Sequence, residues 1–83
     1  MAKERNNYRY ELKDGKKVVY KGYTNNPERR ENEHEDEGKR FTHMNIVGPA
    51  VTKETAENWE EESLEAYRKS HNGKNPKYNK TSK

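Results

Sequence analysis

The sequence contains no cysteine, and this absence excludes disulfide bridges and zinc sites built on thiolates. Hydrophobic residues make up only 25% of the chain, so the core must be thin and the stability modest. No apolar run approaches the length of a membrane span, and the opening residues Met-Ala-Lys-Glu-Arg lack the pattern of a secretory signal. We therefore expect a cytoplasmic protein that does not contact a membrane.

Charged residues are the most abundant class, at 40% of 83 residues, which places the chain near the composition of disordered proteins. Two features favour folding: the net charge is only +3, and six tyrosines and one tryptophan fall where strands and helices are expected. The length allows one small domain. We expect this domain to span residues 7–79, with flexible ends at residues 1–6 and 80–83.

The charges are segregated along the chain. Residues 68–83 contain six lysines or arginines and no acid, whereas the acids concentrate in residues 28–37 and 54–65. Basic ends around an acidic middle suit a protein that touches a polyanion on one side. For most of the acidic residues, a solvated helix face is the simpler explanation.

The first half of the chain predicts a β-hairpin. Residues 8–12 alternate between large and polar side chains, residues 17–20 include two β-branched residues and one aromatic residue, and Asp14-Gly15 lies between them as a turn. A two-residue loop would pair Tyr10 with Val19 and put Tyr20 on the opposite face. We favour a three-residue loop over residues 14–16, which pairs Tyr10 with Tyr20. One face would then hold five side chains: Tyr8, Tyr10, Leu12, Val18 and Tyr20.

A helix is expected to follow directly. Asn26 has the properties of an N-cap, Pro27 suits the first helical position, and Gly38 stops a helix that runs to about Glu37. This helix has almost no apolar residues, so burial alone cannot hold it. Arg30 and His34 are four residues apart and share a face, and we expect both side chains to reach inward.

The second half predicts a strand and a longer helix. Apolar residues between Phe41 and Val51 indicate a third strand, and Thr52 caps a helix that runs to about Ser70. One stripe of this helix should pack on the sheet; its members are Ala56, Trp59, Ser63, Ala66 and Tyr67, with Leu64 beside them. The predicted fold class is α+β, a three-stranded antiparallel sheet with two flanking helices in the order β-β-α-β-α. An irregular, ordered arm to Asn79 follows.

This order of elements, together with the residues placed on it, resembles the GIY-YIG nuclease domain. The two signature tripeptides would be Tyr8-Arg9-Tyr10 and Tyr20-Lys21-Gly22, and ten positions separate both Tyr10 from Tyr20 and Tyr20 from Arg30. The first tripeptide lacks glycine and isoleucine, and Lys21 stands where an apolar residue is usual. If Lys21 faces solvent, that change is harmless, and if it is buried, the sheet packs differently.

The resemblance implies a small endonuclease that hydrolyses nucleic-acid phosphodiesters with Mg²⁺ or Mn²⁺, and DNA is the favoured substrate. Arg30 would bind a phosphate oxygen. Tyr10 would act as general base if the metal and Arg30 lowered its pKa. Tyr20 and His34 would contact the phosphate or the attacking water, and Asn79 would orient a partner.

The resemblance also implies a metal-binding glutamate on the second helix. Glu60 has the expected apolar neighbours, namely Ala56 four residues before it and Trp59 directly before it. Glu62 is the alternative. If Glu60 is the ligand, it must point toward the face of the sheet that carries Tyr10 and Tyr20.

Two other functions stay open. The chain could be a nucleic-acid-binding module that kept the fold and lost catalysis, in which case binding should weaken steeply with salt. It could instead be an interaction protein whose charges only make it soluble. The sequence leaves open DNA or RNA, single or double strands, and the oligomeric state, for which a monomer is the simplest expectation.

Overall fold

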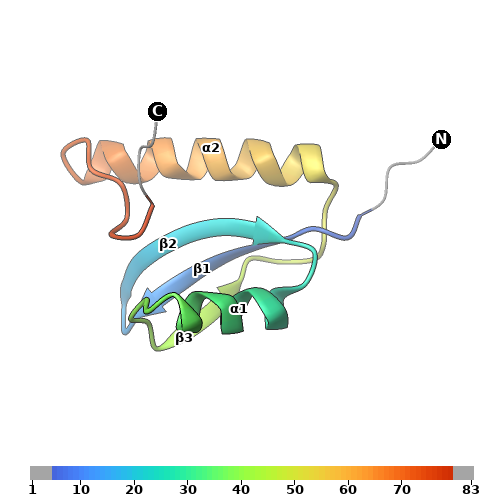
Figure 1. The fold of residues 1–83 in the computed structure, drawn as a ribbon. Coiled ribbons are helices and arrows are strands. Elements are labelled where there is room, and N and C mark those ends of the chain that lie inside the picture. The colour runs from blue at the N-terminus through green and yellow to red at the C-terminus, as the bar shows by residue number, and fades with distance from the viewer. Residues whose placement is uncertain (1–4, 80–83) are drawn as a thin grey trace.

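The computed structural model describes residues 5–79, so the expectations for residues 1–4 and 80–83 lie outside the described residues. The elements follow in the order β1 (Tyr8–Asp14), β2 (Lys17–Thr24), α1 (Pro27–Asp36), β3 (His43–Ile46) and α2 (Lys53–Ser70) (Figure 1). The three strands form one antiparallel sheet in the order β2-β1-β3. The predicted α+β fold, with three strands and two helices, is confirmed. Within residues 5–79, neither helix is long and apolar enough to cross a membrane.

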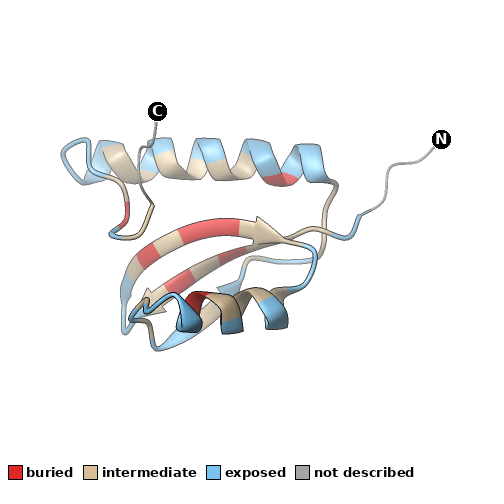
Figure 2. Cartoon of the chain, in the orientation of Figure 1, coloured by how far each residue is buried: buried red, intermediate tan, exposed pale blue. Residues whose placement is uncertain are grey.

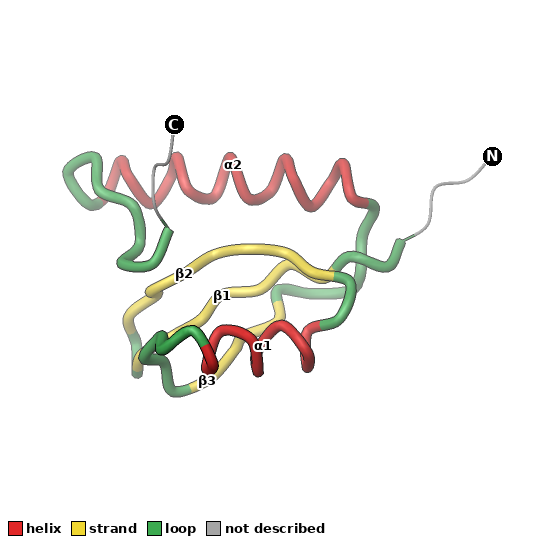
Figure 3. Tube along the Cα trace, in the orientation of Figure 1, coloured by secondary structure: helices red, strands yellow, loops and turns green. Residues whose placement is uncertain are grey.

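The sheet lies between the two helices, with α2 over one face and α1 over the other (Figures 1 and 3). Side chains alternate across a strand, so each face has its own set. Tyr10 pairs with Gly22 in β2, and their face meets α1. The neighbouring pair of Glu11 and Lys21 belongs to the face under α2, where the ammonium of Lys21 lies 5.7 Å from the ring of Trp59.

The register of the hairpin differs from the expected one. Asp14 pairs with Lys17 across a two-residue turn, and Tyr10 pairs with Gly22 and not with Tyr20. A β-bulge then brings Tyr20 opposite Leu12, so Tyr10 and Tyr20 still share a face. The predicted shared face is confirmed and the predicted three-residue loop is wrong.

The bulge also changes which valine enters the core. Val18 pairs with Lys13, and Val19, only 2% exposed, takes the core position predicted for Val18.

Both helices begin where the sequence predicted. The side chain of Asn26 accepts a hydrogen bond from the backbone N–H of Arg29, and Pro27 occupies the first turn of α1. The side chain of Thr52 caps α2 in the same way through the N–H of Thr55. These ends are encoded locally, since each cap needs only residues within one turn.

The hydrophobic core is small. Within residues 5–79, the buried core residues are Tyr10, Leu12, Val19 and Ala56, Pro76 of the arm is also fully buried, and Figure 2 shows buried segments in red on β1, β2 and α2. Of the stripe predicted on α2, Ala66 is exposed, which is a correction, and Trp59 is half-buried.

The arm after α2 returns to the sheet and covers the outer edge of β2. The backbone N–H of Tyr78 donates to the carbonyl of Val19 at 2.7 Å. The side-chain amide of Asn79 bonds the backbone of Lys21 twice, because Oδ1 accepts from its N–H at 2.7 Å and Nδ2 donates to its carbonyl at 2.9 Å. Asn79 therefore pairs with β2 much as a further strand would.

Candidate functional site

A hydrogen bond between Tyr10 of β1 and His34 of α1 forms the centre of the candidate site. The hydroxyl of Tyr10 lies 2.7 Å from Nε2 of His34, and both side chains are 0% exposed. His34 is the buried residue of α1, a helix whose other residues, apart from Pro27, are polar. The predicted inward reach of His34 is confirmed.

Tyr20 and Arg30 complete the site. The ring of Tyr20 lies 4.7 Å from the His34 ring and 6.0 Å from the Tyr10 ring, measured between centroids. The guanidinium of Arg30 interacts with the hydroxyls of both tyrosines while its side chain stays 31% exposed. We call Tyr10, Tyr20, Arg30 and His34 the Tyr–His site.

Gly22 leaves the space into which the Tyr10 hydroxyl fits. A Cβ atom at this position would come within 2.9 Å of both Tyr10 Oη and Tyr20 Cε2. The close approach requires glycine, as expected for a glycine inside a strand next to a tightly packed group.

Electrostatics at Tyr10 run against the role of general base. Burial, then the neighbouring Tyr20, raises the pKa of Tyr10 well above its ordinary value, and Arg30 offsets this only in part. Arg30 acts on the Tyr10 pKa in the predicted downward direction, but the burial of the phenol outweighs it, and the lowering expected from a metal ion stays a prediction. Burial alone would lower the pKa of Arg30, but contacts with Glu33 and the two tyrosines outweigh it, so the guanidinium stays charged.

His34 is held neutral. Burial, followed by the positive charges of Arg30 and Lys39, lowers the pKa of His34 to about 4. The Tyr10 hydroxyl and Nε2 of the neutral imidazole share this hydrogen bond, and which of the two donates depends on the tautomer; the other ring nitrogen is Nδ1. That Nδ1 is buried without a hydrogen-bond partner among residues 5–79, with Glu37 Oε1 3.7 Å away.

Two charged residues at the mouth of the site were not predicted. The ammonium of Lys39 lies 5.6 Å above the ring of Tyr20 and pairs with Glu37. The Lys39 pair lowers the pKa of Glu37. The sequence offered no spacing rule for Lys39, which follows the end of α1 and reaches the site only through the turn at Gly38.

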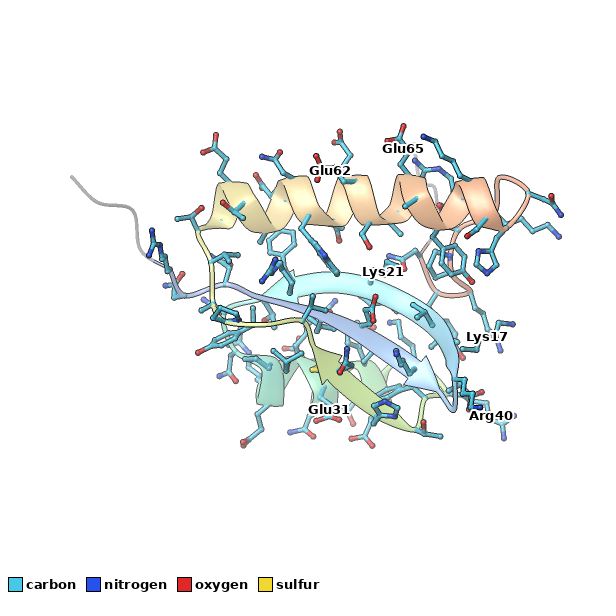
Figure 4. All side chains as sticks on the ribbon, turned by 180° about the vertical axis from the view of Figure 1, so that it is seen from behind. Lys17, Lys21, Glu31, Arg40, Glu62 and Glu65 are labelled. Atoms are coloured by element: carbon cyan, nitrogen blue, oxygen red, sulfur yellow. The ribbon has the colours of Figure 1, made fainter. Side chains whose placement is uncertain are left out.

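The structure does not bring the predicted metal ligand onto the face that carries the Tyr–His site. Glu60 is half-buried on α2, over the opposite face of the sheet. There Glu57 accepts a hydrogen bond from Tyr23 at 3.2 Å, and burial, Glu57 and Glu60 together raise the pKa of Tyr23. The alternative, Glu62, is exposed and points away from the sheet (Figure 4).

The residues of the Tyr–His site do not fit a magnesium ion by themselves. Mg²⁺ prefers carboxylate oxygens and water. The carboxylates on this face, Glu33 and Glu37, are paired with Arg30 and Lys39. No group of three or more histidine or acidic residues in the described part of the chain could hold a metal.

The side chains of Lys21 and Asn79 make contacts within the protein that stabilise the fold. The ammonium of Lys21 is 2.6 Å from Glu11 Oε2, and the residue is 8% exposed, so Lys21 is buried under α2 and does not face solvent. The amide of Asn79 is occupied by the backbone of Lys21. Asn79 thus holds the strand that carries Tyr20, and the structure does not bring its amide into the Tyr–His site.

No family model, curated protein or solved structure matches the sequence. The case for a function therefore depends on the geometry of the chain's own residues.

Proposed function

We propose that this chain is a small nuclease of the GIY-YIG type that acts on the phosphodiester backbone of nucleic acid, with DNA as the favoured substrate. The observation that carries the proposal is the Tyr10–His34 hydrogen bond at 2.7 Å, with Tyr20 and Arg30 against it. Four positions that the resemblance marks come from three elements and meet at one place. If each of these residues had only a packing or surface role of its own, there would be no reason for the four side chains to lie together.

The solvent exposure of each side chain in the Tyr–His site indicates its role in the proposed reaction. Arg30 is accessible and charged, so it would donate to non-bridging phosphate oxygens after exchanging its 2.9 Å ion pair with Glu33. Tyr20, half-buried beside it, would place its hydroxyl against the same phosphate. The enclosed pair of Tyr10 and His34 would position Tyr20 and Arg30 without touching the substrate.

A second candidate function is phosphate binding without hydrolysis. It is favoured by the complete burial of Tyr10 and by the position of Glu60 over the other face of the sheet. In that case Arg30 and Lys39 would still attract a nucleic-acid backbone, and binding would weaken as salt rises.

Nicking of supercoiled plasmid tests the first candidate, with Mg²⁺ or Mn²⁺ supplied in the buffer. Arg30→Ala should reduce the rate at least about 100-fold, the usual loss when a charge-stabilising donor is removed. Arg29→Ala is the matched control, since Arg29 is adjacent, 66% exposed and also faces Glu33. Equal rates for the two variants would contradict the proposal.

Failure of the folded wild-type protein to nick under any of these conditions would leave the second candidate, which salt-dependent binding of an oligonucleotide then tests. Glu60→Gln compared with Glu62→Gln decides separately whether α2 contributes to the reaction. A loss confined to Glu60→Gln would restore the predicted metal role.

A further inference from the structure

A hollow of about 380 Å³ lies at the C-terminal end of α2, where the arm turns back toward β2. Its lining includes three lysines, Lys17, Lys74 and Lys77, together with Tyr67, His71 and Asn75, and no acidic residue belongs to the lining in the part of the chain that is described. We call this surface the basic hollow. Its three ammonium groups come from β2 and from the arm, two segments far apart in the sequence.

The shape of the basic hollow is fixed by hydrogen bonds. Arg68 donates through Nη1 to Oδ1 of Asn75 at 2.9 Å. The backbone N–H of Gly73 donates to the carbonyl of Arg68 at 2.7 Å, and that of Lys74 donates to the carbonyl of His71 at 3.1 Å. The loop that carries Lys74 is therefore tied to the end of α2 and is not a loose tail.

An aromatic stack forms one wall of the basic hollow. The rings of Tyr67 and His71 lie 3.7 Å apart between centroids and are parallel within 3°. Nδ1 of His71 donates to the carbonyl of Tyr67 at 2.9 Å, which fixes the imidazole in this orientation. His71 is exposed, so its ring offers a flat surface beside the lysines.

Contacts connect this region to the Tyr–His site. The ammonium of Lys77 lies 5.3 Å from the ring of Tyr78, and the hydroxyl of Tyr78 accepts from the backbone N–H of Arg40 at 2.9 Å. Lys39, the preceding residue, lies over the ring of Tyr20. Figure 4 shows Lys17 and Arg40 at the same end of the molecule.

We propose that the basic hollow binds a single-stranded nucleic-acid segment, with phosphates on Lys74 and Lys77 and a base stacked on His71, and guides the same strand toward Tyr20 and Arg30. Ammonium groups that follow a backbone, next to an aromatic platform, are the features with which proteins hold single strands. This inference rests on the proposed function for its second half, the delivery of the strand to the Tyr–His site.

Binding of a fluorescein-labelled oligothymidylate, followed by fluorescence anisotropy over a range of KCl, tests the phosphate contacts. Lys74→Gln/Lys77→Gln should lower the slope of log K against log salt by about 1.4, because each phosphate that is no longer neutralised accounts for about 0.7. Arg5→Gln/Lys53→Gln is the control, because it removes the same charge from two exposed residues at the other end of the molecule. Equal slopes for the two variants, or no binding by the wild-type protein, would overturn the proposal.

The stacking platform needs its own variant. His71→Ala should weaken binding at least about fivefold, the low end for one stacked base, with an unchanged salt slope. His43→Ala, at an exposed histidine on β3, should have no effect. If His71→Ala behaves like His43→Ala, or if polyglutamate at equal charge competes as well as the oligonucleotide, the hollow binds anions in general and the proposed base contact is wrong.

Hydrolysis of bis(p-nitrophenyl) phosphate separates this inference from the proposed function, because so small a diester does not reach the basic hollow. The lysine variant should hydrolyse it at the wild-type rate. Hydrolysis without the expected decrease in the salt slope would overturn the inference alone, and the expected slopes without hydrolysis would overturn the proposed reaction alone.

Discussion

The hydroxyl of Tyr10 and Nε2 of His34 depend on each other, since both are enclosed and each is a partner of the other. Tyr10→Phe would leave Nε2 of the imidazole buried without its hydrogen-bond partner. We expect the free energy of unfolding to fall by about 1–3 kcal/mol, the usual desolvation cost of such a group, as measured by urea titration. Tyr8→Phe, at a half-buried tyrosine of the same strand, should cost less than about 0.5 kcal/mol. Equal losses would mean that the hydrogen bond contributes nothing.

His34 makes stability depend on pH. Its pKa is about 4 in the folded protein, against an ordinary value of 6.5, so the unfolded chain binds more protons between these values. The stability from His34 is complete above about pH 6.5 and is lost as the pH falls toward 4. The loss should reach about 3 kcal/mol at most, because a tenfold difference in proton affinity between the folded and unfolded states corresponds to about 1.36 kcal/mol.

The measurement for His34 is the free energy of unfolding at pH 7 and at pH 4.5, in the wild type and in His34→Gln. The variant should lose less stability on acidification than the wild type does. His43→Gln, at an exposed histidine, is the control and should follow the wild type. A His34→Gln protein that lost stability in parallel with the wild type would show that carboxylates alone set the acid sensitivity.

Gly22→Ala should destabilise the protein by about 1–3 kcal/mol, because the new methyl group overpacks the space beside two tyrosines. Combining it with Tyr10→Phe removes the hydroxyl that lies 2.9 Å from the new carbon. The double variant should therefore lose less than the sum of the two single losses, as a double-mutant cycle would show. If the two losses simply added, the Gly22→Ala loss would not come from contact with the Tyr10 hydroxyl.

The four residues of the Tyr–His site could be predicted to lie together because each step of that prediction used residues close in the sequence. Alternation put Tyr10 and Tyr20 on a strand face, and the spacing of Arg30 and His34 put them on a helix face. The face of the sheet that receives α2 was not predictable in this way. It depends on how Trp59 and Lys21 pack, and a helix rich in glutamates fits either face equally well.

Among the elements, β2 should be the most sensitive to a single substitution, because the arm covers its outer edge. Asn79→Ala would remove both hydrogen bonds to the backbone of Lys21. We expect a loss of about 1–3 kcal/mol in the free energy of unfolding, together with faster hydrogen exchange at the amide of Lys21. Asn58→Ala, at an exposed position on α2, should change neither quantity. Unchanged exchange at Lys21 would show that the arm does not hold β2.

Helix ends and strand register differ in how far they can be predicted. The caps at Asn26 and Thr52 depend only on residues within one turn of them, and both were predicted correctly. The bulge between β1 and β2 is not marked by a characteristic residue, since Val18 and Val19 are identical side chains and either could take the core position. The choice between them is made by packing, because only one register puts Tyr20 opposite Leu12 and lets Tyr10 meet His34.

At the scale of the whole molecule, the few buried apolar residues of the described segment must stabilise a chain in which 40% of residues are charged. A domain of this size has a free energy of unfolding of only about 5–10 kcal/mol. Leu12→Ala should remove about 2–5 kcal/mol of it, because Leu12 is fully buried in one cluster with Tyr10 and Val19.

We expect Leu12→Ala to unfold well below the wild-type melting temperature, as followed by circular dichroism. Leu64→Ala, at a half-buried leucine of α2, should shift the melting temperature less. A larger shift for Leu64→Ala would mean that the packing under α2, and not the cluster around Tyr10, dominates stability.

The covering of β2 by Asn79 has a consequence for the newly made chain. In sequence, 58 positions separate Lys21 from the residue that closes its edge. At about 5–20 residues per second, a ribosome needs roughly 3–12 s to add them. During those seconds the hairpin can already form, but its outer strand has unpaired backbone groups that other nascent chains can join. Final closure therefore waits until Asn79 has left the ribosomal exit tunnel.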